Sequence, residues 1–238
     1  DTNCETYSGV LVGQILEAEN VSSDIIIENS AAQEIIAGND NANQYFGGII
    51  GFNEGKNVTV NYSYVNFKGQ GNSDAKVGKC NVAGGYVGKT IGNVTVKDCT
   101  VQIDSKNINA VTFGGVVGQI GTKDENSVVV VDGFGYRNNR DNASSTVLDS
   151  SANNTDAIWG GIAGHVNKGS VLELDSTIDQ NTNVNVLDVD TQFKYFGNIV
   201  GYNDNALIYI NPKSYFKYLY KYYACDIWEK VVIYYKTT

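Results

Sequence analysis

The 238-residue chain has no methionine, one proline (Pro212) and one histidine (His165), and these scarcities narrow the class of protein. With a single histidine, a Ser-His-Asp or Cys-His catalytic arrangement has only that residue to use, and no Gly-x-Ser-x-Gly nucleophile elbow is present. No Gly-Lys-Ser/Thr phosphate-binding loop occurs either. No apolar run approaches the roughly 20 residues of a membrane-spanning helix. We therefore expect a non-enzymatic chain with no cofactor and no membrane span.

Positive charge is scarce and unevenly placed along the chain. Residues 1–206 hold 12 basic and 24 acidic side chains, whereas residues 207–238 hold five lysines and two acids, for a formal charge of −9 overall. Nucleic-acid phosphates require clustered Lys and Arg, so the acidic body argues against a nucleic-acid partner. The acidity serves solubility in the simplest interpretation, and in the alternative it attracts the basic tail of another molecule.

Cysteine is also sparse, with four residues that lie too far apart for a CxxC metal or redox motif. This spacing argues against zinc. Acidic residues offer no better metal site, since no Asp-x-Asp-x-Asp-Gly loop or nonapeptide calcium repeat occurs. Asp98, Asp132 and Asp175 each follow a strand-like run and are expected to stack along one corner, where such residues most often stabilise a turn. We expect no metal ion.

What the chain has in quantity is a short phrase: a lead-in residue, two small residues, two apolar residues and a closing glycine. A unit that recurs every few tens of residues cannot bury its apolar face alone, so neighbouring copies must stack into one core. The two small residues let the backbone turn sharply, and the closing glycine provides a positive φ or a close approach. The six copies span residues 8–13, 46–51, 83–88, 113–118, 159–164 and 196–201.

The spacing of the phrase identifies the kind of repeat. The closing glycines lie 38, 37, 30, 46 and 37 residues apart, an irregularity that a β-solenoid tolerates at its corners. A polar turn and a second strand-like run follow each phrase, and a third run fits several copies. We therefore predict an all-β fold, a right-handed parallel β-helix of about six coils over residues 1–211, with the phrase as the first strand of each coil and a C-terminal β tail over residues 212–238. An aromatic ladder in the core or on one face is expected from Phe46, Phe113, Trp159 and Phe196.

Two copies with their following strands, Gly47–Gly55 with Val58–Val60 and Gly84–Gly88 with Val94–Cys99, resemble the GLUG-type repeat of bacterial and protist surface proteins. The resemblance covers roughly residues 8–211 and departs at the first copy, which lacks the paired glycines, and at Asn198, which replaces the second. It implies a β-solenoid in a secreted adhesin, surface protein or structural filament, with no catalytic residues to transfer.

Six Asn-x-Ser/Thr sequons are candidates for N-glycosylation in an extracellular or cell-surface protein, although so much asparagine yields several by chance. Two of them, Asn57 and Asn93, occupy the same place in successive repeats, at an expected corner. The candidates are Asn20, Asn57, Asn61, Asn93, Asn142 and Asn153.

The tail has two interpretations: it caps its own last coil, or it adds strands to a neighbour's open edge. Cys4 in the first coil and Cys225 beyond the last lie too far apart for a bond within one straight stack, so a disulfide between them joins two molecules. Cys80 and Cys99 belong to one coil and either pair or, for Cys99, act as a small buried apolar residue. The aromatic residues expected to make assembly contacts are Tyr215, Tyr218, Tyr220, Tyr222 and Trp228.

We therefore expect an extracellular structural protein, a self-assembling fibre or surface-layer subunit whose main partner is a second copy bound head to tail. The alternative is a carbohydrate- or host-binding adhesin that recognises glycans through exposed aromatic residues and the Arg137–Arg140 loop. A polysaccharide-degrading enzyme is the third possibility, and it requires two or more carboxylates clustered on one face.

Overall fold

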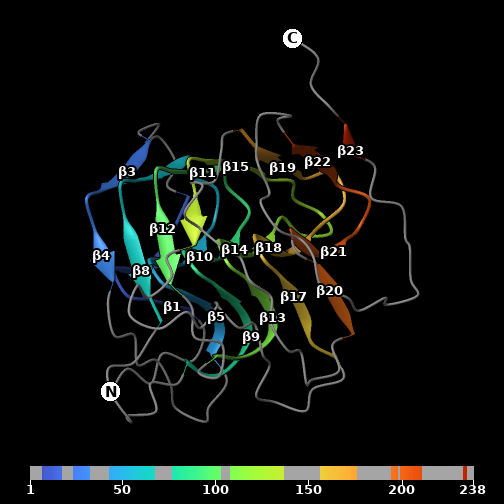
Figure 1. Ribbon diagram of the computed structural model, residues 1–238, viewed down its shortest axis with the longest axis horizontal. Helices are drawn as coiled ribbons and strands as arrows, with labels where there is room; N and C mark the ends of the chain where they lie inside the picture. Colours follow the sequence, from blue (N-terminus) through green and yellow to red (C-terminus); the bar gives the residue numbers. More distant parts are fainter. Residues whose placement is uncertain are drawn as a thin grey trace.

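The computed structural model describes residues 7–17, 24–32, 43–67, 77–102, 108–136, 156–175, 194–197, 199–210 and 233–234. Within these ranges the chain is all β, with no helix, and its strands form four parallel sheets. Strands of successive repeats lie side by side in each sheet, so the sequence runs from one end of the stack to the other (Figure 1). This arrangement is compatible with a parallel β-solenoid.

Sheets A and B each contain six strands, one from each copy of the phrase. In both sheets the strands follow one another in chain order. Sheet A contains β1 (Tyr7–Gly9), β5 (Asn43–Gly47), β9 (Val77–Gly84), β13 (Ile108–Gly114), β17 (Ile158–Gly160) and β20 (Tyr195–Gly197). Sheet B contains β2 (Val12–Ile15), β6 (Ile50–Asn53), β10 (Val87–Thr90), β14 (Val117–Ile120), β18 (Ala163–Val166) and β21 (Val200–Asn203).

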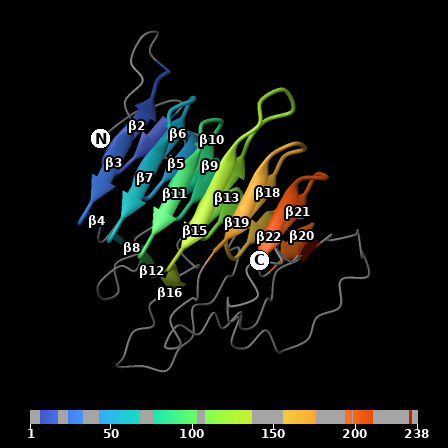
Figure 2. The same cartoon turned by 90° about the horizontal axis from the view of Figure 1, so that it is seen from above.

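Sheets C and D complete the stack, and the strands of sheet C are seen side by side in Figure 2. Their alternating residues are buried, as the period of two in runs such as Val-Thr-Val predicts. Sheet C contains β3 (Ile25–Glu28), β7 (Val58–Asn61), β11 (Val94–Lys97), β15 (Val128–Asp132), β19 (Val171–Leu174), β22 (Leu207–Ile210) and β23 (Ile233–Tyr234). Sheet D contains β4 (Ala31–Ala32), β8 (Tyr64–Asn66), β12 (Thr100–Gln102) and β16 (Gly135–Tyr136).

The phrase forms the sharp corner between sheets A and B instead of one strand. In the second copy, Gly47 ends β5, Gly48 and Ile49 bend, and Gly51 is the second residue of β6. The glycines are required by close approach, and none of those in the phrase has a positive φ. A Cβ on Gly47 would lie 1.8 Å from the Ile50 carbonyl oxygen and 2.7 Å from the amide nitrogen of Gly88 in the next layer. Backbone therefore packs on backbone at this corner.

The core is a set of residue columns that run along the stack. The predicted aromatic ladder lies in one column of sheet A, where Phe113 and Trp159 are fully buried with ring centroids 5.0 Å apart. Ala83 interrupts the column, and the buried ring of Tyr86 belongs to the same layer. The Trp159 indole N–H donates to the Ala110 carbonyl at 3.1 Å, so this side chain has a partner for its polar atom.

A second corner follows the strands of sheet C and uses left-handed backbone in four successive layers. Its residues include Tyr62 and Asp98, with φ near +48°. This corner corrects the expected stack of Asp98, Asp132 and Asp175, because Asp132 aligns with Lys97 and not with Asp98. Strands β11 and β15 end together at the pair of Lys97 and Asp132, so Asp98 already lies in the turn, where its amide donates to the Asp132 carbonyl at 2.8 Å. The corner residues are Asn29, Tyr62, Asp98 and Gly133.

The C-terminal tail contributes a short strand to its own stack. Strand β23 pairs in parallel with β22, with Ile233 opposite Ile208 and Tyr234 opposite Tyr209. These two residues of the tail therefore pair with the last repeat of their own chain. Sheet C is thereby one strand taller than sheets A and B at this end.

Candidate interaction surfaces

Two outward columns on sheets A and B lie next to each other and form what we call the outer strip. One column consists of the residues two places before the first glycine of the phrase, and the other of the residues directly after the closing glycine. The register confirms that His165 shares its column with Phe52, Lys89, Gln119 and Tyr202. Sheet A contributes Tyr7, Tyr45, Val82, Thr112, Ile158 and Tyr195, and sheet B contributes Gln14, Phe52, Lys89, Gln119, His165 and Tyr202.

The N-terminal half of the outer strip is an aromatic cluster around one ammonium group. The Tyr7 ring stacks on Tyr45 and on Phe52, with centroids 5.6 and 5.1 Å apart. Lys89 Nζ lies 4.7 Å from the Tyr45 ring centroid and donates to the Tyr45 hydroxyl at 3.2 Å. Cation–π contact of this kind contributes about 0.5–1 kcal/mol at a partly exposed site. The cluster therefore orders side chains from three layers.

The C-terminal half of the outer strip is also an aromatic cluster, in which the His165 ring takes the place of the lysine. The Tyr195 and Tyr202 rings stack 4.8 Å apart, and the His165 ring meets Tyr202 edge to face at 5.0 Å. Burial lowers the pKa of His165, and the carboxylate of Asp204 opposes that effect in part. His165 is thus a neutral ring of this cluster near pH 7. The sheet A column was not predicted from the sequence. The pattern that indicates it is a tyrosine two residues before the first glycine of the phrase, which occurs in three of the six copies.

The N-terminal end of the stack leaves core positions open. Leu11 is 50% exposed, although Ile49, Tyr86 and Val116, which occupy the same place in the next three layers, are fully buried. Strands β1, β2, β3 and β4 are the first strands of their sheets, so each presents an edge without a sheet partner in the part of the chain that is described. Such an edge is a template for another strand.

Two of the six sequon asparagines lie on the exposed corner between sheets B and C. Asn57 Nδ2 donates to Asp24 Oδ1 at 3.1 Å, and Asn93 Nδ2 donates to Asn57 Oδ1 at 3.1 Å. Asn93 Oδ1 in turn accepts the Val128 amide at 3.0 Å. Asn61 differs, because its side-chain oxygen is buried without a hydrogen-bond partner. The exposed amides are therefore those of Asn57 and Asn93, while Asn20, Asn142 and Asn153 lie outside the described residues.

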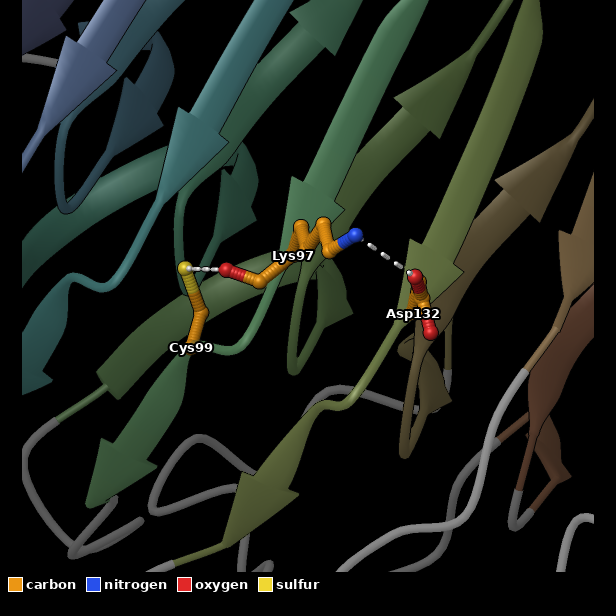
Figure 3. A network of polar contacts seen from close by, with 3 residues as sticks. All are labelled: Lys97, Cys99 and Asp132. Carbon is orange, nitrogen blue, oxygen red and sulfur yellow. Dashed lines mark hydrogen bonds and ion pairs between the residues drawn. The ribbon is translucent and has the colours of Figure 1, made fainter.

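Cys80 and Cys99 are thiols in the structure, so the pairing that the sequence left open is not present. Cys80 lies within strand β9 of sheet A, whereas Cys99 lies at the corner between sheets C and D. Burial raises the pKa of the Cys80 thiol to about 12 and also raises that of Cys99. The Cys99 thiol donates to the Lys97 carbonyl at 3.1 Å (Figure 3). It thus behaves as the small buried residue of the alternative interpretation.

The Cys99 corner also carries one ion pair between neighbouring layers. Lys97 Nζ lies 3.5 Å from Asp132 Oδ2, with the lysine side chain about half exposed (Figure 3). An exposed pair of this kind contributes about 0–1 kcal/mol. The same column holds Glu28 and Asn61 on the side toward the first coil. The ion pair therefore contributes little to the stability of the stack.

The tail aromatics named above and the cysteines Cys4 and Cys225 lie outside the described residues. Within the described ranges, no group of three or more His, Cys, Asp or Glu residues is placed to hold a metal ion. The same part of the chain contains no helix of the length and apolarity needed to cross a membrane. Comparisons with protein-family models, curated proteins and solved structures find no match to this chain.

Proposed function

We propose that this chain is an extracellular structural protein that assembles head to tail into a fibre or surface layer. The observation that supports this most is the N-terminal end of the stack, where Leu11 is half exposed and β1 to β4 have an unpaired edge within the described ranges. A layer of a second copy would cover both, since strand addition uses exactly such edges. Contact between two unlike ends repeats without limit unless it closes into a ring.

In this proposal the stack is a right-handed solenoid of about six coils. The two six-stranded parallel sheets support the coil number, and the strong preference of parallel crossovers for the right hand supports the handedness. The GLUG-like phrase and the exposed sequon asparagines Asn57 and Asn93 support an extracellular location.

Sedimentation velocity over a concentration series, with electron microscopy of the same samples, tests the assembly. We expect larger species to grow with concentration and to appear as rods of constant width. A non-reducing gel then tests whether Cys4 and Cys225 link the copies. A chain that stays monomeric at every concentration, and forms no ladder on that gel, would refute the proposal.

The outer strip favours a second candidate function, a carbohydrate-binding adhesin. Partly exposed tyrosines with a lysine among them, as in Tyr7, Tyr45 and Lys89, suit sugar hydroxyls as well as neighbouring rings. A glycan array distinguishes the two functions, because binding that is lost in Tyr45→Ala without any change in oligomeric state would support the adhesin.

A further inference from the structure

We propose that the copies join through sheet C, where β23 of one copy pairs in parallel with β3 of the next. This inference rests on the proposed head-to-tail assembly and specifies its interface. Sheet C is the only one of the four sheets to which a described strand of the tail adds, so β23 is the outermost strand at that end. At the other end of the same sheet, β3 is the outermost of the described strands.

The register of sheet C fixes which residues meet. Ile26 of β3 and Tyr234 of β23 stand at opposite ends of one continuous column that passes through every strand of the sheet. Continuing this register across the joint places Ile26 of one copy opposite Tyr234 of another. The Ile26 side chain is 63% exposed, so part of its surface is available to be buried in that contact.

The glycines of the phrase indicate that two copies do not stack directly on each other through sheets A and B. A Cβ on Gly48 would lie 2.2 Å from the Gly85 carbonyl oxygen of the following layer. Close stacking of layers at this corner requires glycine at this position, whereas the sequence of the last copy of the phrase has asparagine there. A joint made through β23 lies one strand further out in sheet C, about 4.8 Å.

Charge selects a head-to-tail joint over a head-to-head one. The first 55 residues contain nine acids and no lysine or arginine, and Glu17, Asp24 and Glu28 are exposed at the N-terminal end of the stack. Two such ends would repel each other. Residues 207–238 instead hold five lysines against two acids, so this segment of the sequence carries the charge that is attracted to the acidic N-terminal end of another copy.

Cysteine cross-linking tests the joint in the full-length chain. In one molecule Ile26 and Tyr234 are six strand spacings apart, about 29 Å, so the pair I26C with Y234C can bond only between copies. Across the proposed joint their Cα atoms lie about 4.8 Å apart, within disulfide reach. The control pair, E28C with Y234C, is displaced by two residues to about 8 Å, beyond that reach. Mass spectrometry of the linked peptides distinguishes these bonds from any made by Cys4 or Cys225.

We expect the first pair to cross-link under a mild oxidant and the control pair to remain reduced. Equal cross-linking of both pairs would overturn the register. Oligomers without the Ile26–Tyr234 bond would overturn the joint and leave the proposed function standing, whereas the absence of oligomers in the unmodified chain would overturn both.

A charge variant provides a second, independent measurement. Glu28→Lys places a cation on the acidic end and is expected to weaken association about tenfold in sedimentation equilibrium. Asp124→Lys makes the same charge change on an exposed loop in the middle of the stack and should leave association unchanged. An equal effect of the two variants would mean that net charge, and not this joint, governs assembly. Circular dichroism verifies that both variants fold.

Discussion

The closing glycine of the phrase allows one matched comparison between the end of the stack and its interior. Gly13 and Gly88 occupy the same position in the first and third copies, and neither has a positive φ. A Cβ on Gly88 would lie 2.5 Å from the Gly51 carbonyl oxygen and 2.6 Å from that of Phe46 in the preceding layer. A Cβ on Gly13 would meet only the Tyr7 carbonyl oxygen, at 3.4 Å. The difference arises because, among the described residues, no strand of sheet B lies before β2, which contains Gly13.

These distances determine how much each Gly→Ala substitution changes the free energy of unfolding. At Gly88 the two carbonyls must move by several tenths of an ångström against hydrogen-bonded strands, and overpacking of this kind costs about 1–3 kcal/mol, with rigid sites at the upper end. We therefore expect Gly88→Ala to destabilise the chain by about 3 kcal/mol, which is about 6–12 °C in Tm for a chain of this size. Gly13→Ala fits without strain and restricts the unfolded chain, so it is expected to stabilise by about 0.4–1 kcal/mol.

Urea denaturation followed by circular dichroism measures both variants under the same conditions. The reasoning requires opposite signs, with the midpoint lowered for Gly88→Ala and unchanged or raised for Gly13→Ala. Equal destabilisation by the two variants would show that glycine serves this position through its flexibility, and the close-approach explanation would be refuted.

Three further predictions concern single side chains. Tyr62→Gly relieves a left-handed residue that is largely exposed and should raise stability by about 0.5–1 kcal/mol in urea melts; a loss would contradict this. Tyr86→Phe removes the hydroxyl that lies within hydrogen-bond distance of the Ser63 and Thr100 carbonyls and donates its one hydrogen there. The substitution should cost about 1–3 kcal/mol in the same assay, whereas a neutral result would mean that the core relaxes. Because burial lowers the pKa of His165 below its ordinary 6.5, the folded chain binds fewer protons, so stability is complete above about pH 6.5 and falls on acidification. His165→Gln should abolish that part of the fall between melts at about pH 7.5 and 5.5, and an unchanged difference would refute the linkage.

Much of the fold followed from the sequence because spacing alone implies stacking. The six phrases predicted strands of successive repeats side by side, and sheets A and B contain them in that order. The prediction that the phrase forms the first strand of each coil was wrong, because six residues with paired glycines are compatible with a strand and with a corner alike. Only the approach of Gly47 to Ile50 and Gly88 decides for the corner.

The interaction surfaces were less accessible to sequence reasoning. The column of His165 was identified from its position after the closing glycine, but its neighbours from sheet A were not. Tyr195 and Tyr202 are seven residues apart on two different sheets, and their stacking depends on the angle of the A–B corner. The register of Asp132 with Lys97 likewise depends on hydrogen bonds between coils, which the linear order does not contain.

The sequence by itself determined that this chain stacks, because a repeat with an apolar face and glycine corners has no other way to bury that face. It also determined the charge contrast between the acidic body and the basic tail. Only the tertiary structure decided which positions lack a neighbouring layer among the described residues, since Leu11 is half exposed where Ile49 is buried, and β23 adds a strand to sheet C. Whether a position is buried depends on whether another layer packs on it, and the linear order of residues does not contain that information.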